Sequence, residues 1–345
     1  MKMNMVEEKV KELIEENDFS GAIFVQMNES LIEQFSHGFA NRTDQVLNQV
    51  NTRFGIASGC KLFTAIAICQ LVEQEKITFE TKLKDCLHFV FPAFDSSITI
   101  HHLLTHTAGI PDYFDEELMD DFEELWITHP MYLIRNLSDF LPLFQNKPMK
   151  LQVGERFHYN NAGYIILGLI VETVSGMKFS EYVTAYIFKK ANMHASGYFE
   201  LDALPSNTAT GYIDFPDGKW KSNIYSLPVK GGADGGAFVT VEDMSKLWDS
   251  LMNFQLLSET YTKKLLTPYI HTDDDFNRFY GYGIWIDQIH YEISKYHVMG
   301  YDPGASFHAA YYPINKAISV VCSNKSTGAF PIFNAVEQMI NDQKE

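Results

Sequence analysis

Apolar residues recur with helical spacing near both ends of the chain. Residues 6–14 place four apolar side chains on one face of a helix, which we expect to stop around Asn17. These four are Val6, Val10, Leu13 and Ile14. Pro331 predicts the first turn of a last helix. Its apolar face is formed by Ile332, Phe333, Val336, Met339 and Ile340. Both segments are predicted to be amphipathic helices packed on a core.

Strand-like runs occupy two separate parts of the chain. Residues 22–27 and 31–35, parted by two polar residues, predict a hairpin near the start. Four more runs follow near the end, at 281–287, 296–300, 306–312 and 317–322. A turn at 313–316 joins the last two runs, and the strands near the start must meet those near the end, so we expect one antiparallel sheet.

The segment Lys61–Glu73 is apolar on nearly every side, which predicts a helix buried at the centre of the molecule. Residues 76–230 carry helical patterns and long loops with little alternation. We therefore predict an α/β (α+β) fold, an antiparallel sheet flanked by helices. Residues 1–75 and 231–345 would form the sheet domain, with 76–230 as a mostly helical insertion and the active site at the seam.

The charge balance excludes several classes of partner. The 345 residues include 44 acidic and 27 basic side chains, a net charge of −17, so nucleic acid and anionic membrane surfaces are unfavourable partners. The longest apolar runs fall short of the roughly 18 residues that cross a bilayer, so we expect no membrane span. Glutamates interrupt the first 17 residues where a signal peptide would be apolar. We expect a cytoplasmic protein, unless a signal peptide has been removed.

The metal-binding residue types do not form a recognisable site. The four cysteines have neither zinc-site nor disulfide-framework spacing, which favours free buried thiols. They are Cys60, Cys69, Cys86 and Cys322. The adjacent pair His101 and His102 stands outside any His-Glu-x-x-His segment. We predict no metal and no cofactor.

Two Ser-x-x-Lys segments are candidates for nucleophilic chemistry. Ser58 and Lys61 lie one turn apart at the start of the central helix, where a lysine in a low-dielectric site can take the serine proton. The helix N-terminus adds N–H groups for a developing oxyanion. Ser175 and Lys178 instead follow an apolar helix, and Gly176 stands where a C-cap would be. There the helix dipole opposes an oxyanion, so Ser175 is predicted to be structural.

Further stretches resemble the serine β-lactamase and penicillin-binding-protein superfamily, in particular its class C β-lactamase and esterase branch. Residues 53–65, Arg-Phe-Gly-Ile-Ala-Ser-Gly-Cys-Lys-Leu-Phe-Thr-Ala, resemble the nucleophile segment of that branch. Residues 103–111, Leu-Leu-Thr-His-Thr-Ala-Gly-Ile-Pro, are similar to a second signature. Residues 154–164 contain a Tyr-x-Asn motif, and 231–243 look like the family's glycine-rich turn. The resemblance covers roughly residues 20–340.

The resemblance implies a role for each matching residue. Ser58 would be the acylated nucleophile and Lys61 its proton acceptor or electrostatic activator. Tyr159 would carry a proton to the leaving group, and beside a cation its pKa of about 10 is expected to fall. Asn161 would orient Lys61 and bind the acyl side of the substrate. The backbone N–H groups of Ser58 and Tyr301, next to Gly300, would form the oxyanion hole.

Three other residues near these motifs have weaker assignments. The resemblance places His106 in a structural segment behind the cleft, so we interpret it as a hydrogen-bonded core histidine. Tyr113 is expected at the cleft mouth. Asp234 lies among glycines in a loop that could face substrate, although such aspartates usually make turns.

The family's third motif, Lys-Thr-Gly or His-x-Gly, is broken in this chain. Aligned on Gly300, the sequence reads Val298-Met299-Gly300, without a basic residue. His297 stands one place earlier, and alternation along a strand should turn it away from the cleft while Val298 looks into it. The missing cation would ordinarily bind a substrate carboxylate. Turnover of penicillin-like acids is therefore unfavourable.

Three functions remain open at this point. The first is a serine hydrolase acting through an acyl-enzyme on a small ester or amide without the usual carboxylate. The second is a non-hydrolytic penicillin-binding or sensor protein on the same fold, since fold does not fix function. The third is a true β-lactamase or DD-peptidase in which His297 is reoriented. The expected partners are small ester, amide or β-lactam-like molecules.

Overall fold

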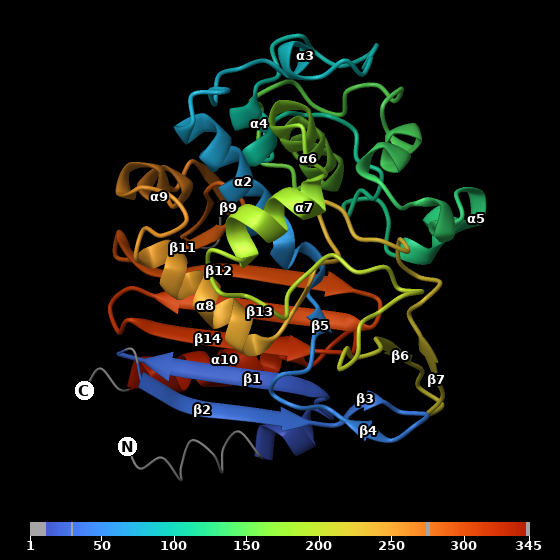
Figure 1. Ribbon diagram of the computed structural model, residues 1–345, viewed down its shortest axis with the longest axis vertical. Coiled ribbons are helices and arrows are strands. Elements are labelled where there is room, and N and C mark those ends of the chain that lie inside the picture. The colour runs from blue at the N-terminus through green and yellow to red at the C-terminus, as the bar shows by residue number, and fades with distance from the viewer. Residues whose placement is uncertain (1–11, 29, 274–276, 343–345) are drawn as a thin grey trace.

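The centre of the molecule is an eight-stranded antiparallel sheet (Figure 1), in a computed structural model that describes residues 12–28, 30–273 and 277–342. Across the sheet the order is β2, β1, β14, β13, β12, β11, β10, β9. The strands are β1 Gly21–Met27, β2 Ser30–His37, β9 Ile270–Asp273, β10 Arg278–Tyr280, β11 Trp285–Ile289, β12 Glu292–Asp302, β13 Ala305–Tyr312 and β14 Ala317–Ser323. Strands from both ends of the chain therefore pair at β1 and β14.

The predicted strands are found with one correction. The hairpin near the start and the last three strands are confirmed. The strand predicted at 281–287 is wrong at its start, because β10 ends at Tyr280 and β11 begins at Trp285. Between them the N–H of Gly281 donates to the carbonyl of Ile284 at 2.8 Å. Gly283 has φ +69°, and a Cβ there would lie 2.7 Å from the carbonyl oxygen of Lys61, so this turn requires glycine.

Helices cover both faces of the sheet, as the sequence predicts. On one face, α8 (Val241–Met252) crosses β14 and β1. On the other, α10 (Ala329–Asp342) packs against β13 and β14 and begins two residues before Pro331. Ile14, in the helical residues 12–16, is buried in the same cluster as α10. Val6 and Val10 lie outside the described residues.

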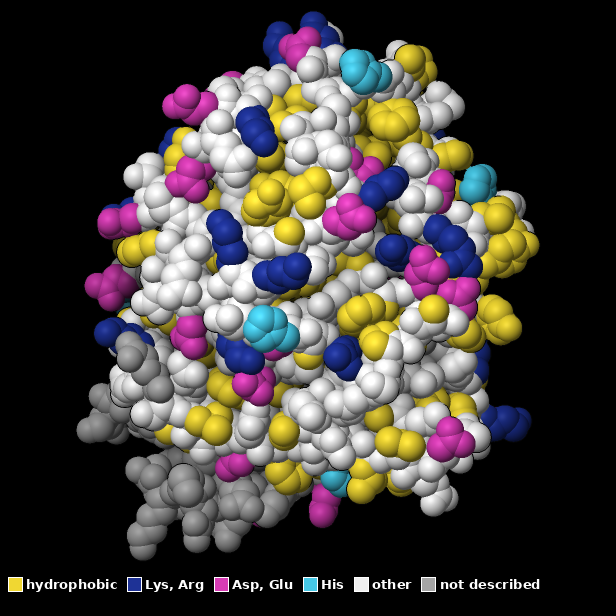
Figure 2. Space-filling model, in the orientation of Figure 1, with side chains coloured by type: hydrophobic (Ala, Val, Ile, Leu, Met, Phe, Trp, Pro, Cys, Tyr) yellow, Lys and Arg dark blue, Asp and Glu magenta, His cyan; other side chains and the backbone are white. Residues whose placement is uncertain are grey.

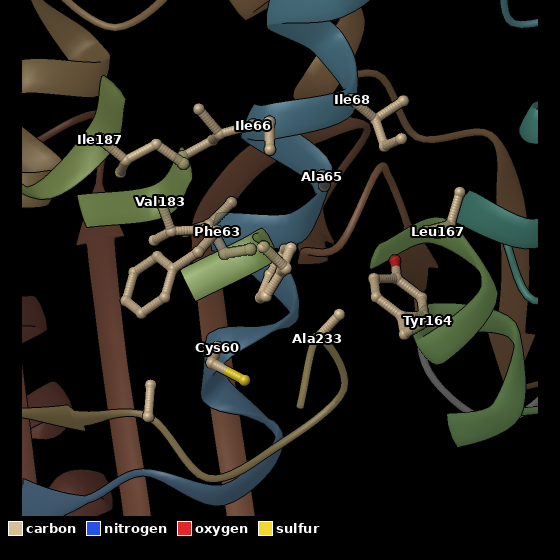
Figure 3. Close-up of a cluster of buried hydrophobic side chains, with 14 of the residues drawn as sticks. Cys60, Phe63, Ala65, Ile66, Ile68, Tyr164, Leu167, Val183, Ile187 and Ala233 are labelled. Carbon is tan, nitrogen blue, oxygen red and sulfur yellow. The ribbon is translucent and has the colours of Figure 1, made fainter. Parts of the chain in front are cut away.

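The helix α2 (Lys61–Glu73) lies at the centre of the molecule. Every residue from Lys61 to Val72 is buried, which confirms the prediction from its apolar pattern. Figure 3 shows α2 between two other helices, with Phe63 facing Val183 and Ile187 on one side and Tyr164 and Leu167 on the other. Because α2 is enclosed on all sides, the side chains at its first turn are held in a rigid position.

Regular structure in residues 76–230 is mainly helical, and long loops join the helices. The helices are α3 Leu83–Cys86, α4 Ile100–Leu104, η2 Phe122–Glu124, α5 Leu125–Thr128, η3 Met131–Leu133, η4 Leu137–Leu143, α6 Asn161–Ser175, α7 Phe179–Val183 and η5 Thr184–Phe188. The strands β6 (Tyr212–Asp214) and β7 (Trp220–Ser222) pair there. Among the described residues no single helix is long and apolar enough to cross a membrane; α6 and the helical segment after it meet that test only jointly, across a 76° bend.

Short elements complete the fold. They are β3 Phe39–Asn41, β4 Val46–Leu47, β5 Phe54–Gly55, η1 Ala57–Cys60, β8 Phe238–Val239 and α9 Glu259–Leu265. The pairing of β5 with β8 ties the segment before the central helix to the segment before α8. Over the face seen in Figure 2, acidic and basic side chains are interspersed with apolar ones. This face therefore carries no broad patch of one sign.

Candidate active site

Ser58 lies in η1, the single turn that enters the central helix. The residue before it, Ala57, has φ +45°, a left-handed conformation that costs a non-glycine residue about 1–3 kcal/mol. The carbonyl of Ala57 accepts from the N–H of Gly236 at 3.3 Å, which helps to hold the bend. Ser58 is half-buried and lines the cleft. The strained backbone thus presents the hydroxyl at the cleft floor.

Lys61 is buried, and its ammonium group has three acceptors. Nζ donates to Ser58 Oγ at 2.9 Å, to Asn161 Oδ1 at 2.8 Å and to the carbonyl oxygen of Asp234 at 2.8 Å. An ammonium group has three protons, so this arrangement satisfies all of them. The sequence indicated the first two partners. A backbone carbonyl carries no side-chain signature, and the third was missed.

Tyr159 lies beside both residues. Its ring is 4.8 Å from Lys61 Nζ and stacks against Trp285 at 6.1 Å between centroids. Burial raises its pKa well above 10, the carboxylate of Glu116 raises it further, and a hydrogen bond with Ser58 lowers it. The expectation that this pKa falls is wrong, because desolvation of the phenolate is the largest influence on it and raises it. Tyr159 is therefore a neutral phenol at physiological pH.

Asn161 is the first residue of α6, and a buried carboxylate sets its position. Asp112 accepts from the N–H of Asn161 at 2.6 Å and of Ala162 at 2.9 Å, so it binds the free donors of the helix start. Asn160 caps the same helix by accepting from the N–H of Gly163 at 2.7 Å. These contacts fix the amide that holds Lys61. Nothing in the sequence pattern had singled out Asp112.

His106 is buried directly behind Tyr159, with 4.6 Å between the two ring centroids. Its Nδ1 accepts from the N–H of Asn160 at 3.1 Å, and burial lowers its pKa well below the usual value. A neutral histidine that accepts from the backbone fits the predicted structural role. It supports the back of the tyrosine ring.

Asp234 and Tyr113 both line the cleft. The Tyr113 hydroxyl donates to Asp234 Oδ2, while the carbonyl of Asp234 holds Lys61. Both residues are buried, and burial raises the pKa of the Asp234 carboxyl. The loop of Asp234 therefore does more than make a turn, because it also completes the environment of Lys61.

Ser175 has no lysine partner in its hydrogen bonds. Its hydroxyl donates to the carbonyl of Val171 at 2.6 Å at the end of α6, and Gly176 caps the helix with φ +73°. Hydroxyls that bond four residues back commonly close a last helical turn. The geometry matches the structural role expected for Ser175.

Strand β12 passes directly over the nucleophile turn. A Cβ on Gly300 would lie 2.2 Å from the carbonyl oxygen of Ile56 and 2.8 Å from the backbone nitrogen of Ser58. Only glycine permits this approach. It brings the backbone of Tyr301 to the cleft edge beside Ser58, where both residues line the cavity.

The third-motif positions are apolar or turned away. His297 is buried, with Nε2 3.4 Å from Asp287 Oδ1, in line with the prediction that it faces away from the cleft. Val298 packs in the hydrophobic core at 3 % exposure and does not line the cleft. The prediction that Val298 looks into the cleft is therefore wrong. Its short side chain ends within the layer between the sheet and the helices.

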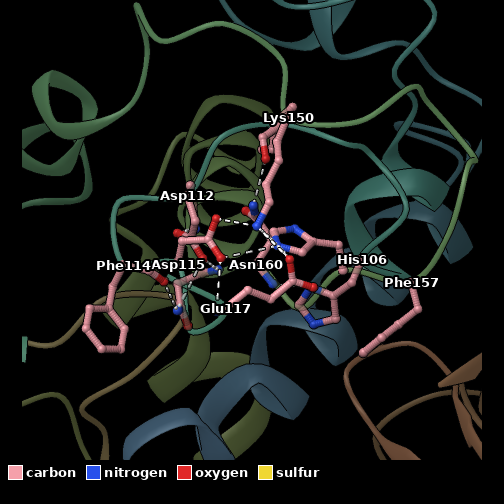
Figure 4. Close-up of polar contacts among 12 residues, drawn as sticks. His106, Asp112, Phe114, Asp115, Glu117, Lys150, Phe157 and Asn160 are labelled. Atoms are coloured by element: carbon pink, nitrogen blue, oxygen red, sulfur yellow. Dashed lines mark hydrogen bonds and ion pairs between the residues drawn. The ribbon is translucent and has the colours of Figure 1, made fainter. Parts of the chain in front are cut away.

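A cluster with metal-ligand residue types lies next to the site (Figure 4). Asp115, Glu117 and His158 bring their ligand atoms within 4.8 Å of one another. The ammonium of Lys150 lies among them, 2.5 Å from Asp115 Oδ2, 2.8 Å from Glu117 Oε2 and 2.8 Å from His158 Nε2. A lysine thus supplies the cation here. Because Lys150 binds both Asp115 and Glu117, it holds the loop in place on both sides of Glu116.

The cleft that joins these groups has a volume of about 940 Å³. Ser58, Tyr159, Asn161, Gly300 and Tyr301 all line it. The five come from η1, the segment before α6, the start of α6 and β12. The space suits a small molecule placed against Ser58.

Comparison with known proteins assigns the family. The Beta-lactamase family model matches residues 6–338. A penicillin-binding protein of Bacillus halodurans is 58% identical, with a TM-score of 0.92 over 96% of this chain and 99% of that one. Penicillin-binding protein 4* of Bacillus subtilis is 26% identical over 288 residues, which are 79% of this chain and 61% of that protein. The D-amino acid amidase of Ochrobactrum anthropi shares the fold, with a TM-score of 0.81 and 17% identity over 98% of this chain and 99% of that one. The chain belongs to the Beta-lactamase family of serine hydrolases and penicillin-binding proteins.

Proposed function

We propose that this protein is a serine hydrolase that acts through an acyl-enzyme on a small ester or amide. The observation that carries the proposal is the position of Lys61 Nζ, 2.9 Å from Ser58 Oγ and also bound to Asn161 and to the carbonyl of Asp234. The three acceptors hold the buried ammonium in a fixed position beside the Ser58 hydroxyl, where its positive charge can stabilise negative charge that develops on the serine oxygen.

In the proposed acylation, Ser58 Oγ bonds to the substrate's carbonyl carbon and the bond to the leaving group breaks. The Ser58 proton passes to the phenol oxygen of Tyr159, and the phenol proton passes to the leaving group. Tyr159 ends as it began, and the alcohol or amine leaves neutral. Water then attacks the ester by the reverse route and releases the acid. The raised pKa of Tyr159 supports a relay that starts from a neutral phenol.

The oxyanion would be bound by the N–H groups of Ser58 and Tyr301. The close approach of Gly300 to Ser58 supports this assignment, because it brings the two backbone segments together at the cleft. Lys61 acts as an electrostatic activator and Asn161 orients it. We also propose that residues 1–75 and 231–345 form one domain, with 76–230 inserted at the site.

Penicillin binding is the second candidate, favoured by the names of the Bacillus relatives. The buried Val298 argues against efficient turnover of penicillins, because no lysine or histidine at that position reaches the cleft to meet a carboxylate. A slowly hydrolysed penicilloyl adduct would fit a sensor. A rapidly hydrolysed one would fit a β-lactamase or DD-peptidase.

Intact mass spectrometry separates these functions. The protein is incubated with a p-nitrophenyl ester or with benzylpenicillin, and the mass and the released product are followed together. A burst of nitrophenol followed by turnover supports the hydrolase. A penicilloyl mass that persists while the ester is not turned over supports the binding protein. Rapid penicillin hydrolysis that exceeds ester turnover supports the lactamase.

A further inference from the structure

All the charged residues that line the cleft are acidic. Six carboxylate residues line it, and no lysine, arginine or histidine among the described residues does so. The six are Glu116, Asp120, Asp121, Glu123, Asp234 and Asp302. A cleft built to hold an anionic acid would offer the opposite charge.

Partners distinguish the inner carboxylates from those at the rim. Glu123 pairs with Lys221 at 2.6 Å, and Asp121 caps η2. Asp302 has neither a hydrogen bond nor an ion pair from its side chain to any residue that the structure describes. Asp302 is half-buried and lines the cleft, so its carboxyl group is partly desolvated but still open to the cleft. A carboxylate that lines the cleft without a cationic partner is free to bind a ligand that supplies the counter-charge.

The position of Asp302 relates it to the reacting carbonyl. Asp302 follows Tyr301 on β12 and lies on the same strand face as Gly300. Two residues along a strand span about 6–7 Å. A group held by Asp302 would therefore lie within a few bonds of the carbonyl carbon of a substrate placed against Ser58.

Two further carboxylates, those of Asp234 and Glu116, contribute negative charge near Asp302. Burial raises the pKa of Asp302 to about 7; the charge of Asp234 raises it further, that of Lys61 lowers it, and that of Glu116 raises it. Glu116 is fixed near them because Lys150 holds the residues on both of its sides. Three carboxyl groups thus surround one part of the cleft.

We infer that the cleft selects acyl donors that carry an ammonium group, such as amides or esters of amino acids, and that Asp302 is the counter-ion. This inference rests on the proposed acyl transfer at Ser58. A substrate ammonium would replace water at Asp302 and relieve the repulsion among the carboxylates. A carboxylate at the same place would meet like charge.

Three p-nitroanilides that differ only at the end of the acyl chain test the inference. β-Alanyl p-nitroanilide carries an ammonium, the butyryl compound a methyl group and the succinyl compound a carboxylate. For the unaltered protein we expect kcat/KM for the β-alanyl compound to exceed that for the butyryl compound by about tenfold, the lower range for a charge-assisted bond. The succinyl compound should be the poorest. Equal values for all three would overturn the inference while leaving the hydrolase proposal intact.

Asp302→Asn should bring the ratio of β-alanyl to butyryl kcat/KM close to one and should raise the relative rate of the succinyl compound. Asp120→Asn removes the same charge from an exposed rim residue and should leave the ratio unchanged. Labelling of Ser58 by a neutral fluorophosphonate checks that each variant is folded. A ratio that stays high in Asp302→Asn, or falls equally in Asp120→Asn, would contradict the assignment. Failure of every probe to acylate Ser58 would instead refute the hydrolase itself.

Discussion

Gly300 and Ser58 are so close that a Cβ on residue 300 would lie 2.8 Å from the backbone nitrogen of Ser58. Residues far apart in sequence thus meet backbone to backbone, and the strand edge and the nucleophile turn hold each other in position. The proposed oxyanion hole depends on this contact, because its two donors lie on either side of it.

Gly300→Ala should therefore impair acylation. The added methyl group meets backbone atoms that cannot move aside, which should cost about 1–3 kcal/mol of unfolding free energy and lower the acylation rate at least tenfold. Gly55→Ala is the matched control, because its nearest neighbour would be a Phe238 ring atom at 3.7 Å. Denaturant titration and stopped-flow acylation measure both effects. A Gly300→Ala protein with normal acylation would show that the contact is dispensable.

Lys61→Ala and Tyr159→Phe should each reduce ester turnover by about 10²–10⁴. We expect the double variant to be little worse than either single one, because both residues serve the same proton transfer. Tyr164→Phe provides the control, since it removes a buried phenol whose hydroxyl donates to the carbonyl of Leu104. Losses that multiply in the double variant would mean that the two side chains act in separate steps.

Val298→Lys should destabilise the protein without restoring penicillin chemistry. The valine is buried among apolar side chains, where a new ammonium would cost several kcal/mol or force the strand to shift. Val298→Met changes volume without charge and is the control. Acylation by benzylpenicillin is compared with acylation by a neutral ester. A selective gain of tenfold or more for penicillin would show that a lysine at 298 reaches the cleft after all.

Asp302→Asn should stabilise the empty protein at alkaline pH. The pKa of Asp302 is raised to about 7 in the folded state, compared with about 4 in the unfolded chain. Its stabilising contribution is therefore complete below pH 4 and is lost as the pH rises to 7. Removing the charge should raise the unfolding free energy at pH 8 by about 2 kcal/mol, roughly half of what the full pKa difference would give without screening, because the side chain is only half-buried. The gain should shrink towards pH 4. Urea titrations across this range measure it, and a gain independent of pH would contradict the account.

Local patterns predicted most of the framework. The uniformly apolar stretch of α2 and the one-sided face of α10 each gave a helix in the right place, and alternation gave the last three strands. The error at 281–287 arose because the turn at Gly283 is set by the distant backbone of Lys61. The alternation of residues along a strand does not indicate such a contact with a distant segment.

The site was predictable where side chains form a motif. Ser58, Lys61, Tyr159 and Asn161 were found from spacing and resemblance, and the structure brings them to one cleft. The carbonyl of Asp234 was not predicted, because its partner Lys61 is more than 100 positions away in the chain. The capping carboxylate of Asp112 was not predicted either, because it binds a backbone N–H group. Burial also reversed the expected pKa of Tyr159, and solvent access cannot be read from a motif. The cytoplasmic location stays a prediction.

The most direct test of the account is the identity of the acylated residue. The protein is treated with a fluorophosphonate, digested and mapped by tandem mass spectrometry, with Ser58→Ala and Ser175→Ala treated in parallel. We predict a single adduct on Ser58, absent in Ser58→Ala and retained in Ser175→Ala, and a loss of about 10⁴–10⁶ in ester turnover for Ser58→Ala alone. An adduct on Ser175, or full turnover by Ser58→Ala, would contradict the central claim.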